Sequence, residues 1–224
     1  MITILNIETA TKNCSVSLTV DGNLLTMKEI AEENFSHAEK LHVFVEDILK
    51  ENNKKWTDLN AIAVSQGPGS YTGLRIGVSA VKGLCYGLSI PMIALDTLEI
   101  LARQLVVEKG LIVSMLDARR MEAYCAVFRP DYTSVGVVEA KVIESDSFDF
   151  IIDQEEIHLI GDGAPKCKDV LTDAKFIYHD SIVYPSAKEM CKMSFEKYNK
   201  SEFVDVAYFE PFYLKDFVLP TKKK

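Results

Sequence analysis

The sequence has no run of apolar residues long enough to cross a membrane, which would need about 20 in succession. Its first residues, Met1–Asn6, lack the basic stretch that opens a signal peptide, so we expect none. Only 11 glycines and 7 prolines occur among 224 residues, too few for a collagen or a low-complexity linker. These absences indicate a globular protein without a membrane span.

Positive charge is also scarce. The chain has 25 lysines and arginines against 33 acidic residues, so its formal net charge is −8. Tight, autonomous binding to nucleic acid needs clustered cations that pair with phosphates, and this balance disfavours it. The one basic cluster, Lys222–Lys224, is expected to be a solvated tail.

Cysteine and histidine are few and do not have the spacing of metal sites or disulfide frameworks. The five cysteines are odd in number and form no C-x-x-C pair, which argues against a zinc ribbon or a thioredoxin-type site. Reduced thiols in a cytoplasm fit best. The histidines form neither H-E-x-x-H nor H-x-x-x-H, and His37 and His42 would point about 140° apart on a helix. We therefore expect no bound metal.

What is present predicts an α/β protein. Residues 13–20 alternate apolar and polar side chains, and Asp21–Gly22 is a hairpin turn signal, so the chain should open with an antiparallel meander. A helix with one apolar stripe should follow, with Ser36 as its cap and Glu39 three residues later. The expected strands are 2–8, 13–20, 24–30, 61–65, 91–95, 111–116, 122–128, 134–143 and 158–160, and the expected helices are 36–52, 73–88, 97–110 and 186–198.

The order of elements repeats after Gly110, where strands and then helices begin again. We place the boundary near residues 107–110, which gives subdomains 1–108 and 109–224. The repeat is one of element order, because the two halves share little sequence.

Gly67–Arg75 is the most unusual segment. Its glycines fit neither the P-loop nor the G-x-G-x-x-G spacing. A glycine-rich turn before a helix nevertheless directs free backbone N–H groups and the positive end of the helix dipole toward one point. Two interpretations stay open: an anion or nucleotide phosphate lies against the turn, or a hydroxyl of this segment simply caps the helix. The candidate anion-binding residues here are Gly67, Gly69, Ser70, Thr72 and Arg75.

The helix that follows carries glycines at positions 73, 77, 83 and 87. Each internal glycine costs a helix about 1 kcal/mol relative to alanine. Such glycines indicate that another backbone comes very close. That backbone belongs either to the protein's own sheet or to a partner helix.

Two acidic residues stand at the ends of buried strands in the two units. Glu8 is followed by Thr9, and Asp117 is followed by Arg119 and Arg120. Acids and hydroxyls at a strand end can hold magnesium and phosphate. The alternative is an ordinary turn with local hydrogen bonds and an ion pair. Placed at matching strand ends of similar units, Glu8 and Asp117 form the catalytic layout of one known architecture.

The chain resembles the TsaB family, also called YeaZ, of the actin/Hsp70/sugar-kinase superfamily. The most specific resemblance is Gly67–Gly77, which is close to the family signature. The segments Ile4–Thr11, Ser36–Leu41, Leu116–Arg120 and Pro211–Lys215 agree as well. The resemblance covers nearly the whole chain, although residues 130–205 match only in outline.

This resemblance implies two actin-like, ribonuclease-H-like subdomains with mixed sheets flanked by helices, and a role in making threonylcarbamoyladenosine in tRNA. It implies a TsaD-like transferase and a TsaE-like ATPase as partners, with a homodimer when the chain is alone. The family's pairing surface is built largely from its first two helices, here 36–52 and 73–88. Gly77→Leu or Val81→Glu should therefore abolish the complex and leave the fold intact. The expected interface residues are Leu41, Val45, Leu74, Arg75, Gly77, Val78, Val81 and Leu84.

Departures from the catalytic relatives predict a non-catalytic scaffold or activator subunit. Those relatives carry an H-x-x-x-H metal pair on the first helix, where this chain has His37 and Lys40–Leu41. Active kinases of the superfamily have Asp and then Gly two residues later, whereas Glu8 is followed by Thr9 and Ala10. We expect no cofactor, with weak contact to ATP or ADP left open. Contact with tRNA should be indirect, because the chain is acidic.

Two rival functions belong to other classes. In an ATP-dependent phosphotransferase of the sugar/acid-kinase type, Glu8 and Asp117 would hold magnesium and Gly161–Gly163 would lie by the nucleotide. A peptidase is disfavoured, because the sequence shows no metal pair and no Ser/His/Asp or Cys/His constellation.

Overall fold

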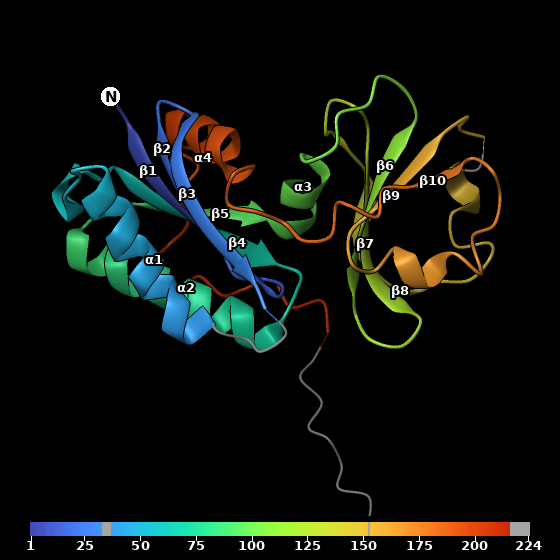
Figure 1. Ribbon diagram of the computed structural model, residues 1–224, viewed down its shortest axis with the longest axis horizontal. Coiled ribbons are helices and arrows are strands. Elements are labelled where there is room, and N and C mark those ends of the chain that lie inside the picture. The colour runs from blue at the N-terminus through green and yellow to red at the C-terminus, as the bar shows by residue number, and fades with distance from the viewer. Residues whose placement is uncertain (33–36, 152, 216–224) are drawn as a thin grey trace, which may run out of the picture.

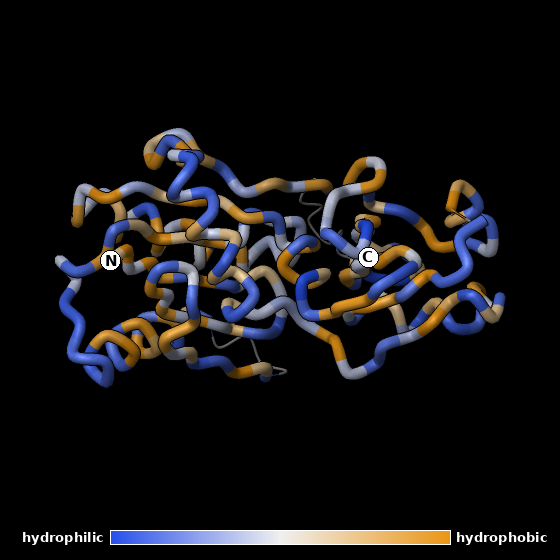
Figure 2. The backbone as a smooth tube through the Cα atoms, turned by 90° about the horizontal axis from the view of Figure 1, so that it is seen from above, coloured by the Kyte–Doolittle hydropathy of each residue, from blue (hydrophilic) through white to orange (hydrophobic). Residues whose placement is uncertain are grey.

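Two five-stranded mixed sheets form the framework of the protein. The computed structural model describes residues 1–32, 37–151 and 153–215. The strand order is β3-β2-β1-β4-β5 in the first sheet and β10-β9-β6-β7-β8 in the second. Figure 1 shows the sheets in two separate lobes, and Figure 2 shows the same lobes from above, with hydrophobic stretches inside each.

The first sheet begins with the antiparallel meander that the alternating pattern predicts. Its strands are β1 (Thr3–Glu8), β2 (Asn13–Val20) and β3 (Asn23–Ala31), and the Asp21–Gly22 turn joins β2 to β3. The strands β4 (Ala61–Gly67) and β5 (Met92–Asp96) extend it in parallel beyond β1. Because β1 lies in the centre of the sheet, it is buried on both faces, and all six of its residues are buried.

Helices cover both faces of this sheet. The helices α1 (His37–Glu51) and α2 (Tyr71–Leu88) pack on one face, where Leu41, Val45, Val78 and Val81 join the core with β1 and β4. A 3-10 helix, η1 (Trp56–Asp58), lies between α1 and β4. On the opposite face, α4 (Met190–Asn199) packs through Met190 and Met193 against Ile4 and Ile93.

The second sheet repeats the arrangement with a different covering. Its strands are β6 (Leu111–Asp117), β7 (Glu122–Phe128), β8 (Ser134–Val142), β9 (Ile157–Ile160) and β10 (Phe176–Tyr178). The short helix α3 (Thr97–Ala102) covers one face, and it packs Leu98 and Leu101 against β6 and β7. The other face is covered by the chain around the 3-10 helices η2 (Asp149–Ile151) and η3 (Pro165–Cys167). Because β6 is central, it corresponds to β1 of the first sheet.

The division into subdomains 1–108 and 109–224 needs a correction. The chain enters the second sheet at Leu111, close to the predicted boundary. However, it returns to the first lobe near Ser186, since α4 and the following Val204 and Phe209 pack on the first sheet. The first lobe is thus built from both ends of the described chain.

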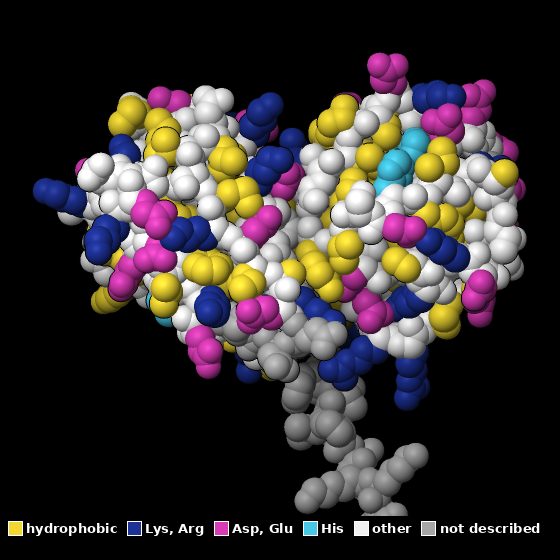
Figure 3. Space-filling model, viewed as in Figure 1, with side chains coloured by type: hydrophobic (Ala, Val, Ile, Leu, Met, Phe, Trp, Pro, Cys, Tyr) yellow, Lys and Arg dark blue, Asp and Glu magenta, His cyan; other side chains and the backbone are white. Residues whose placement is uncertain are grey.

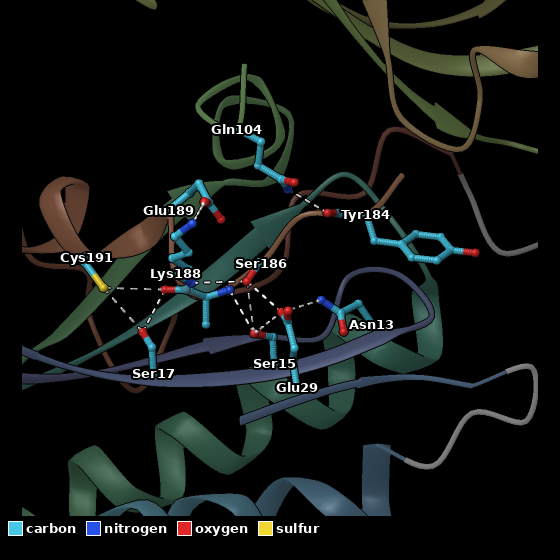
Figure 4. A network of polar contacts seen from close by, with 11 residues as sticks. Asn13, Ser15, Ser17, Glu29, Gln104, Tyr184, Ser186, Lys188, Glu189 and Cys191 are labelled. Atoms are coloured by element: carbon cyan, nitrogen blue, oxygen red, sulfur yellow. Dashed lines mark hydrogen bonds and ion pairs between the residues drawn. The ribbon is translucent and has the colours of Figure 1, made fainter. Parts of the chain in front are cut away.

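A polar network fixes the point of return, as Figure 4 shows. The Ser186 hydroxyl donates to Glu29 of β3 (2.7 Å), and the Ala187 amide donates to Ser15 of β2 (3.0 Å). The Ser17 hydroxyl of the same strand donates to the Ala187 carbonyl (2.7 Å). These bonds replace the partners that the polar side of β2 would otherwise find in water.

Two predicted helices differ in the structure, and one strand was missed. The predicted helix 97–110 ends at Ala102, because Leu105 and Val107 leave the helix to pack near the second sheet. The helix predicted at 186–198 begins at Met190, since the backbone around Ser186 is held by β2 and β3. The strand β10 was not predicted, because three residues are too short to show a period. The predicted cap Ser36 and the predicted tail Lys222–Lys224 lie outside the described residues.

Within the described residues, no helix has the length and apolar character needed to span a membrane.

Candidate functional site

The glycine-rich segment packs closely against the turn that follows β1 and is hydrogen-bonded to it. A side chain on Gly69 would place Cβ 2.3 Å from the Ala10 carbonyl oxygen, and one on Gly73 would place it 2.1 Å from the Thr9 carbonyl oxygen. The Ser70 amide donates to the Ala10 carbonyl (2.6 Å), and the Thr9 hydroxyl donates to the Gly73 carbonyl (2.8 Å). These glycines therefore allow two backbones of the same chain to approach each other.

The four helix glycines have two different surroundings. A Cβ on Gly77 would lie 2.2 Å from the Thr9 hydroxyl oxygen, so Gly77, like Gly73, packs inside the chain. Gly83 and Gly87 have nothing within 4 Å of such a Cβ. Of the two interpretations left open by the sequence, internal packing thus explains the first pair, and the second pair stays on an open surface.

The N-terminal amides of α2 are largely engaged by the protein itself. Ser70 caps the helix, since its hydroxyl accepts from the Gly73 amide (3.2 Å), as one of the two sequence interpretations predicts. The Ser70 amide is bonded to Ala10, and the Leu74 amide donates to the Ser70 carbonyl (2.8 Å). Two candidate anion ligands of this segment therefore have structural roles: Gly69 packs against Ala10, and Ser70 caps α2.

A C-terminal strap, Pro211–Lys215, passes over the same segment. The Phe212 amide donates to the Gln66 carbonyl (2.7 Å). The Tyr213 hydroxyl accepts from Nε of Arg75 (3.3 Å), whose guanidinium lies 4.1 Å from the centre of the Tyr71 ring. The candidate residue Arg75 therefore holds the strap, while Thr72 stays exposed.

Glu8 is fully buried at the end of β1. Burial raises the pKa of its carboxyl to about 7, although the Ala10 amide that donates to it acts in the opposite direction. Its Oε2 atom has no hydrogen-bond partner among the described residues. Magnesium binds ionised carboxylates, so near neutral pH it would have to displace the proton of this enclosed acid.

In the unaltered chain, the free energy of unfolding should fall as the pH rises from about 4.5 to about 7, and Glu8→Gln should abolish this fall. The carboxyl ionises near 4.5 when unfolded and near 7 when folded, so the folded state holds its proton longer. The free energy of unfolding therefore falls as pH rises through this window, by about 3 kcal/mol in total. Urea unfolding at pH 5 and pH 8 measures the difference, with Glu46→Gln on the exposed side of α1 as the control. Equal losses in Glu8→Gln and the unaltered chain would contradict this assignment.

Asp117, the matching acid, is exposed and paired. Its carboxylate accepts from the Lys166 ammonium and from the Arg119 amide (3.1 Å), while its own amide donates to Asp162 (2.8 Å). Lys166 also donates to the Glu122 carbonyl (2.6 Å). The ion pair of the alternative interpretation is thus present at this strand end.

Most of the predicted interface side chains prove to be buried in the protein's own core. Leu41, Val45, Leu74, Val78 and Val81 are at most 3% exposed, and Gly77 is buried against Thr9. These six residues cannot be the contacting surface, because the apolar stripe of each helix faces the sheet. The prediction was wrong for this reason, and only Arg75 and the half-buried Leu84 remain available.

A different face of α1 and α2 is open. Tyr86 is 84% exposed and Val43 is 51% exposed. Ser79, Gly83 and Gly87 lie at helical spacing beside Tyr86, so they form one stripe of small side chains on the outer side of α2. Figure 1 shows α1 and α2 side by side at the outside of the first lobe. We call Val43, Ser79, Gly83, Tyr86 and Gly87 the outer helix face.

Comparisons with known proteins place the chain in a family. A family model described as TsaD, tRNA N6-adenosine threonylcarbamoyltransferase, matches residues 29–218. The Escherichia coli protein named tRNA threonylcarbamoyladenosine biosynthesis protein TsaB is 29% identical over 95% of this chain and 94% of its own length. The solved structure of YeaZ from Pseudomonas aeruginosa is 26% identical, with a TM-score of 0.83 over 96% of this chain and 100% of that one. The chain belongs to the TsaD family, in its TsaB (YeaZ) branch.

A more distant structure agrees with the fold of the TsaB branch. The ethanolamine utilization protein EutJ from Carboxydothermus hydrogenoformans has a TM-score of 0.51 at 9% identity, covering 85% of this chain and 89% of its own. That likeness concerns the fold alone. Two mixed five-stranded sheets flanked by helices make this an α/β protein of the actin-like class, as the resemblance implied.

The buried His37 of this TsaB-family chain serves the fold. His37 is 1% exposed at the start of α1, and its Nε2 atom is hydrogen-bonded to the Thr11 carbonyl (2.7 Å). Burial lowers the pKa of His37, which favours the neutral ring. His42 points to the exposed side of the same helix. Among the described residues, no group of three or more metal-ligating side chains occurs.

Sequence reasoning missed Val43 and Tyr86 of the TsaB-family helices. A signal for both was present, since each is an apolar or aromatic residue that lies off the stripe of its own helix. The apolar stripe of each helix packs against the protein's own sheet. Apolar residues outside it are therefore the better candidates for a partner.

Proposed function

We propose that this chain is a non-catalytic subunit of tRNA threonylcarbamoyladenosine biosynthesis that binds and activates a TsaD-like threonylcarbamoyltransferase. The observation that carries the proposal is the outer helix face, where small residues and the exposed Tyr86 would admit a second helix pair. Packed helices approach to about 8–10 Å, and side-chain-free positions such as Gly83 and Gly87 favour the closest contacts. The names of the TsaB relatives support the same assignment.

The same face would serve two complexes. In the absence of the transferase, a second copy of the chain would occupy it and form a homodimer. A TsaE-like ATPase would join the heterodimer, in the cytoplasm. Exposed aromatic residues near the centre of an interface commonly carry much of its binding energy, which makes Tyr86 the expected anchor.

The absence of independent catalysis rests on the two strand-end acids. Glu8 is fully buried with a pKa raised to about 7, and Asp117 is already paired with Lys166. The ATP-dependent phosphotransferase alternative needs both as magnesium ligands and draws no support from this arrangement. Contact with ATP or ADP would be weak for the same reason.

Gly83→Glu should prevent the chain from recovering a TsaD-like protein in a pull-down. The new carboxylate would stand on the open outer helix face, so it should not disturb the fold, but it would have to be buried on association. We expect affinity for the transferase and for a second copy to fall at least about 100-fold. Mass spectrometry of the captured proteins and sedimentation of the isolated chain measure the two effects.

Asn199→Glu provides the matched control, since it adds the same charge at the exposed end of α4 on the other side of the sheet. It should leave both complexes unchanged. Unaltered recovery of the transferase by Gly83→Glu would refute the interface. Recovery of no transferase by the unaltered chain would refute the proposed function itself.

A further inference from the structure

The connection between β6 and β7 holds two arginines in an unusual conformation. Arg119 and Arg120 have φ angles of 72° and 54°, in the left-handed region where side chains other than Gly, Asn and Asp are uncommon. The turn is closed by the Glu122 amide, which donates to the Arg119 carbonyl (3.2 Å), so Arg120 occupies its first central position. Glycine is favoured at a central position with positive φ. Strained residues of this kind cluster at binding sites, where another requirement opposes relaxation.

Both arginine side chains are available to a ligand. Arg119 and Arg120 are exposed, and neither guanidinium makes a hydrogen bond or ion pair with any of the described residues. The neighbouring lysines differ in this respect, because Lys166 is paired with Asp117 and Lys215 with Glu122. The positive charge that remains unmatched therefore lies at the tip of the turn.

A further cation reaches the same place from the first lobe. Lys12, in the turn after β1, is exposed and interacts electrostatically with Asp162, which is hydrogen-bonded to the Asp117 amide. The local group thus contains five cations and three carboxylates, although the whole chain carries −8. Figure 3 shows lysine and arginine side chains gathered at the lower edge of the molecule, where the two lobes meet. The five cations of the local group are Lys12, Arg119, Arg120, Lys166 and Lys215.

We propose that the Arg119–Arg120 turn, assisted by Lys12, contacts the phosphate backbone of tRNA in the complex described above. The inference rests on the proposed function for the identity of the RNA. Exposed guanidinium groups bind phosphates through paired N–H donors, and such contacts position an RNA without reading its sequence. An extended polyanion fits cations that come from separate turns of both lobes, whereas the carboxylates of Asp117, Glu122 and Asp162 oppose a compact polyphosphate.

A direct contact with tRNA is compatible with the acidic composition of the chain, because it needs only a few phosphate contacts. Two or three phosphate contacts are too few for tight binding by the chain alone, since each contributes only modestly at physiological salt. The partner subunits would hold most of the tRNA, and this turn would orient it. The expectation of purely indirect contact is thereby replaced by a small direct one.

The test measures binding of an unmodified tRNA transcript to the complex of this chain with its TsaD-type transferase. Arg119→Gln with Arg120→Gln should weaken binding about 5- to 30-fold near 0.1 M salt. The slope of log Kd against log salt concentration should fall by about 1.5, because two phosphate contacts are lost. Lys192→Gln with Lys200→Gln removes the same charge from exposed positions of α4 and its C-cap and should change neither quantity.

Arg120→Lys and Arg120→Gly separate charge from backbone geometry. Lys keeps the charge and the positive φ, so it should retain most of the affinity, whereas Gly relaxes the turn and removes the charge and should weaken binding severalfold. Unchanged affinity in Arg120→Gly would mean that the charge at this position does not matter and would overturn the proposal.

Recovery of the complex is measured first, so that failure of the proposed function is seen separately. If the transferase does not bind, the same variants of the chain alone are titrated with the transcript at low salt. The change in the slope of log Kd against log salt concentration then tests the phosphate contacts. Unchanged affinity and slope in the double variant would overturn the proposal. So would loss of the ATPase partner with tRNA binding intact, which would assign the turn to a protein contact.

Discussion

Val81→Glu should unfold the first lobe instead of merely preventing association. Val81 is 0% exposed and belongs to the core between α2 and the first sheet, with Leu5 and Val64. A carboxyl group placed there would be either charged without a partner or neutral without enough hydrogen bonds. We expect a loss of more than about 4 kcal/mol, a large part of the stability of an ordinary domain. Circular dichroism and the yield of soluble protein measure the effect.

Gly83→Glu is the matched control for this result, because it introduces the same side chain into the same helix two residues later. Gly83 faces open space, and replacing an internal helix glycine removes a conformational penalty of about 0.5–1 kcal/mol. Its melting temperature should equal or exceed that of the unaltered chain. A folded Val81→Glu protein with an unchanged melting temperature would contradict the burial of the stripe and restore it as a candidate interface.

Gly73→Ala should destabilise the protein by about 3 kcal/mol, which is large for the addition of one methyl group. The new Cβ would lie 2.1 Å from the Thr9 carbonyl oxygen, and both groups belong to backbones that are held by hydrogen bonds. Neither can move without breaking the contact between the β1–β2 turn and the start of α2. The midpoint of urea unfolding, with an unchanged slope, measures the loss.

Gly87→Ala tests the same substitution at an open position of the same helix. It meets nothing within 4 Å, so only helix propensity should act, and the midpoint should rise slightly. Similar losses at Gly73 and Gly87 would show that close backbone contact is not what requires glycine at Gly73.

The regular elements of the first lobe were predictable from local patterns. The alternation in β2, the Asp21–Gly22 turn and the single apolar stripe of α1 each describe residues that are near one another in sequence. Asp96 caps α3, since its carboxylate accepts from the Leu98 and Glu99 amides. Such features depend on hydrogen bonds and burial within one element or between adjacent ones, which a short stretch of sequence already specifies.

Elements that depend on distant segments could not be placed in this way. The start of α4 is set by Ser186 and Ala187, which bond to Ser15, Ser17 and Glu29 far away in the sequence. The return of the chain to the first lobe follows from the same contacts. The second half of the predicted helix 97–110 gives way to the covering of the second sheet.

The candidate site shows the same limit. The sequence predicted the positions of Glu8, Asp117, the glycine-rich segment and the two helices. Acids at strand ends and glycines in a helix can be recognised from residue types and spacing alone. The sequence could not decide what each group meets. Burial raises the pKa of Glu8 to about 7, whereas Asp117 is exposed and forms an ion pair with Lys166.

By itself, the sequence determined the kinds of element, their order and the positions of the unusual residues, since these follow from periodicity, turn chemistry and local backbone preference. Only the tertiary structure decided which face of each helix is left for a partner. An apolar stripe has the same pattern whether it covers the protein's own sheet or a second molecule. The packing of Val78 and Val81 on the first sheet, with Gly83 and Tyr86 outside, resolves that ambiguity.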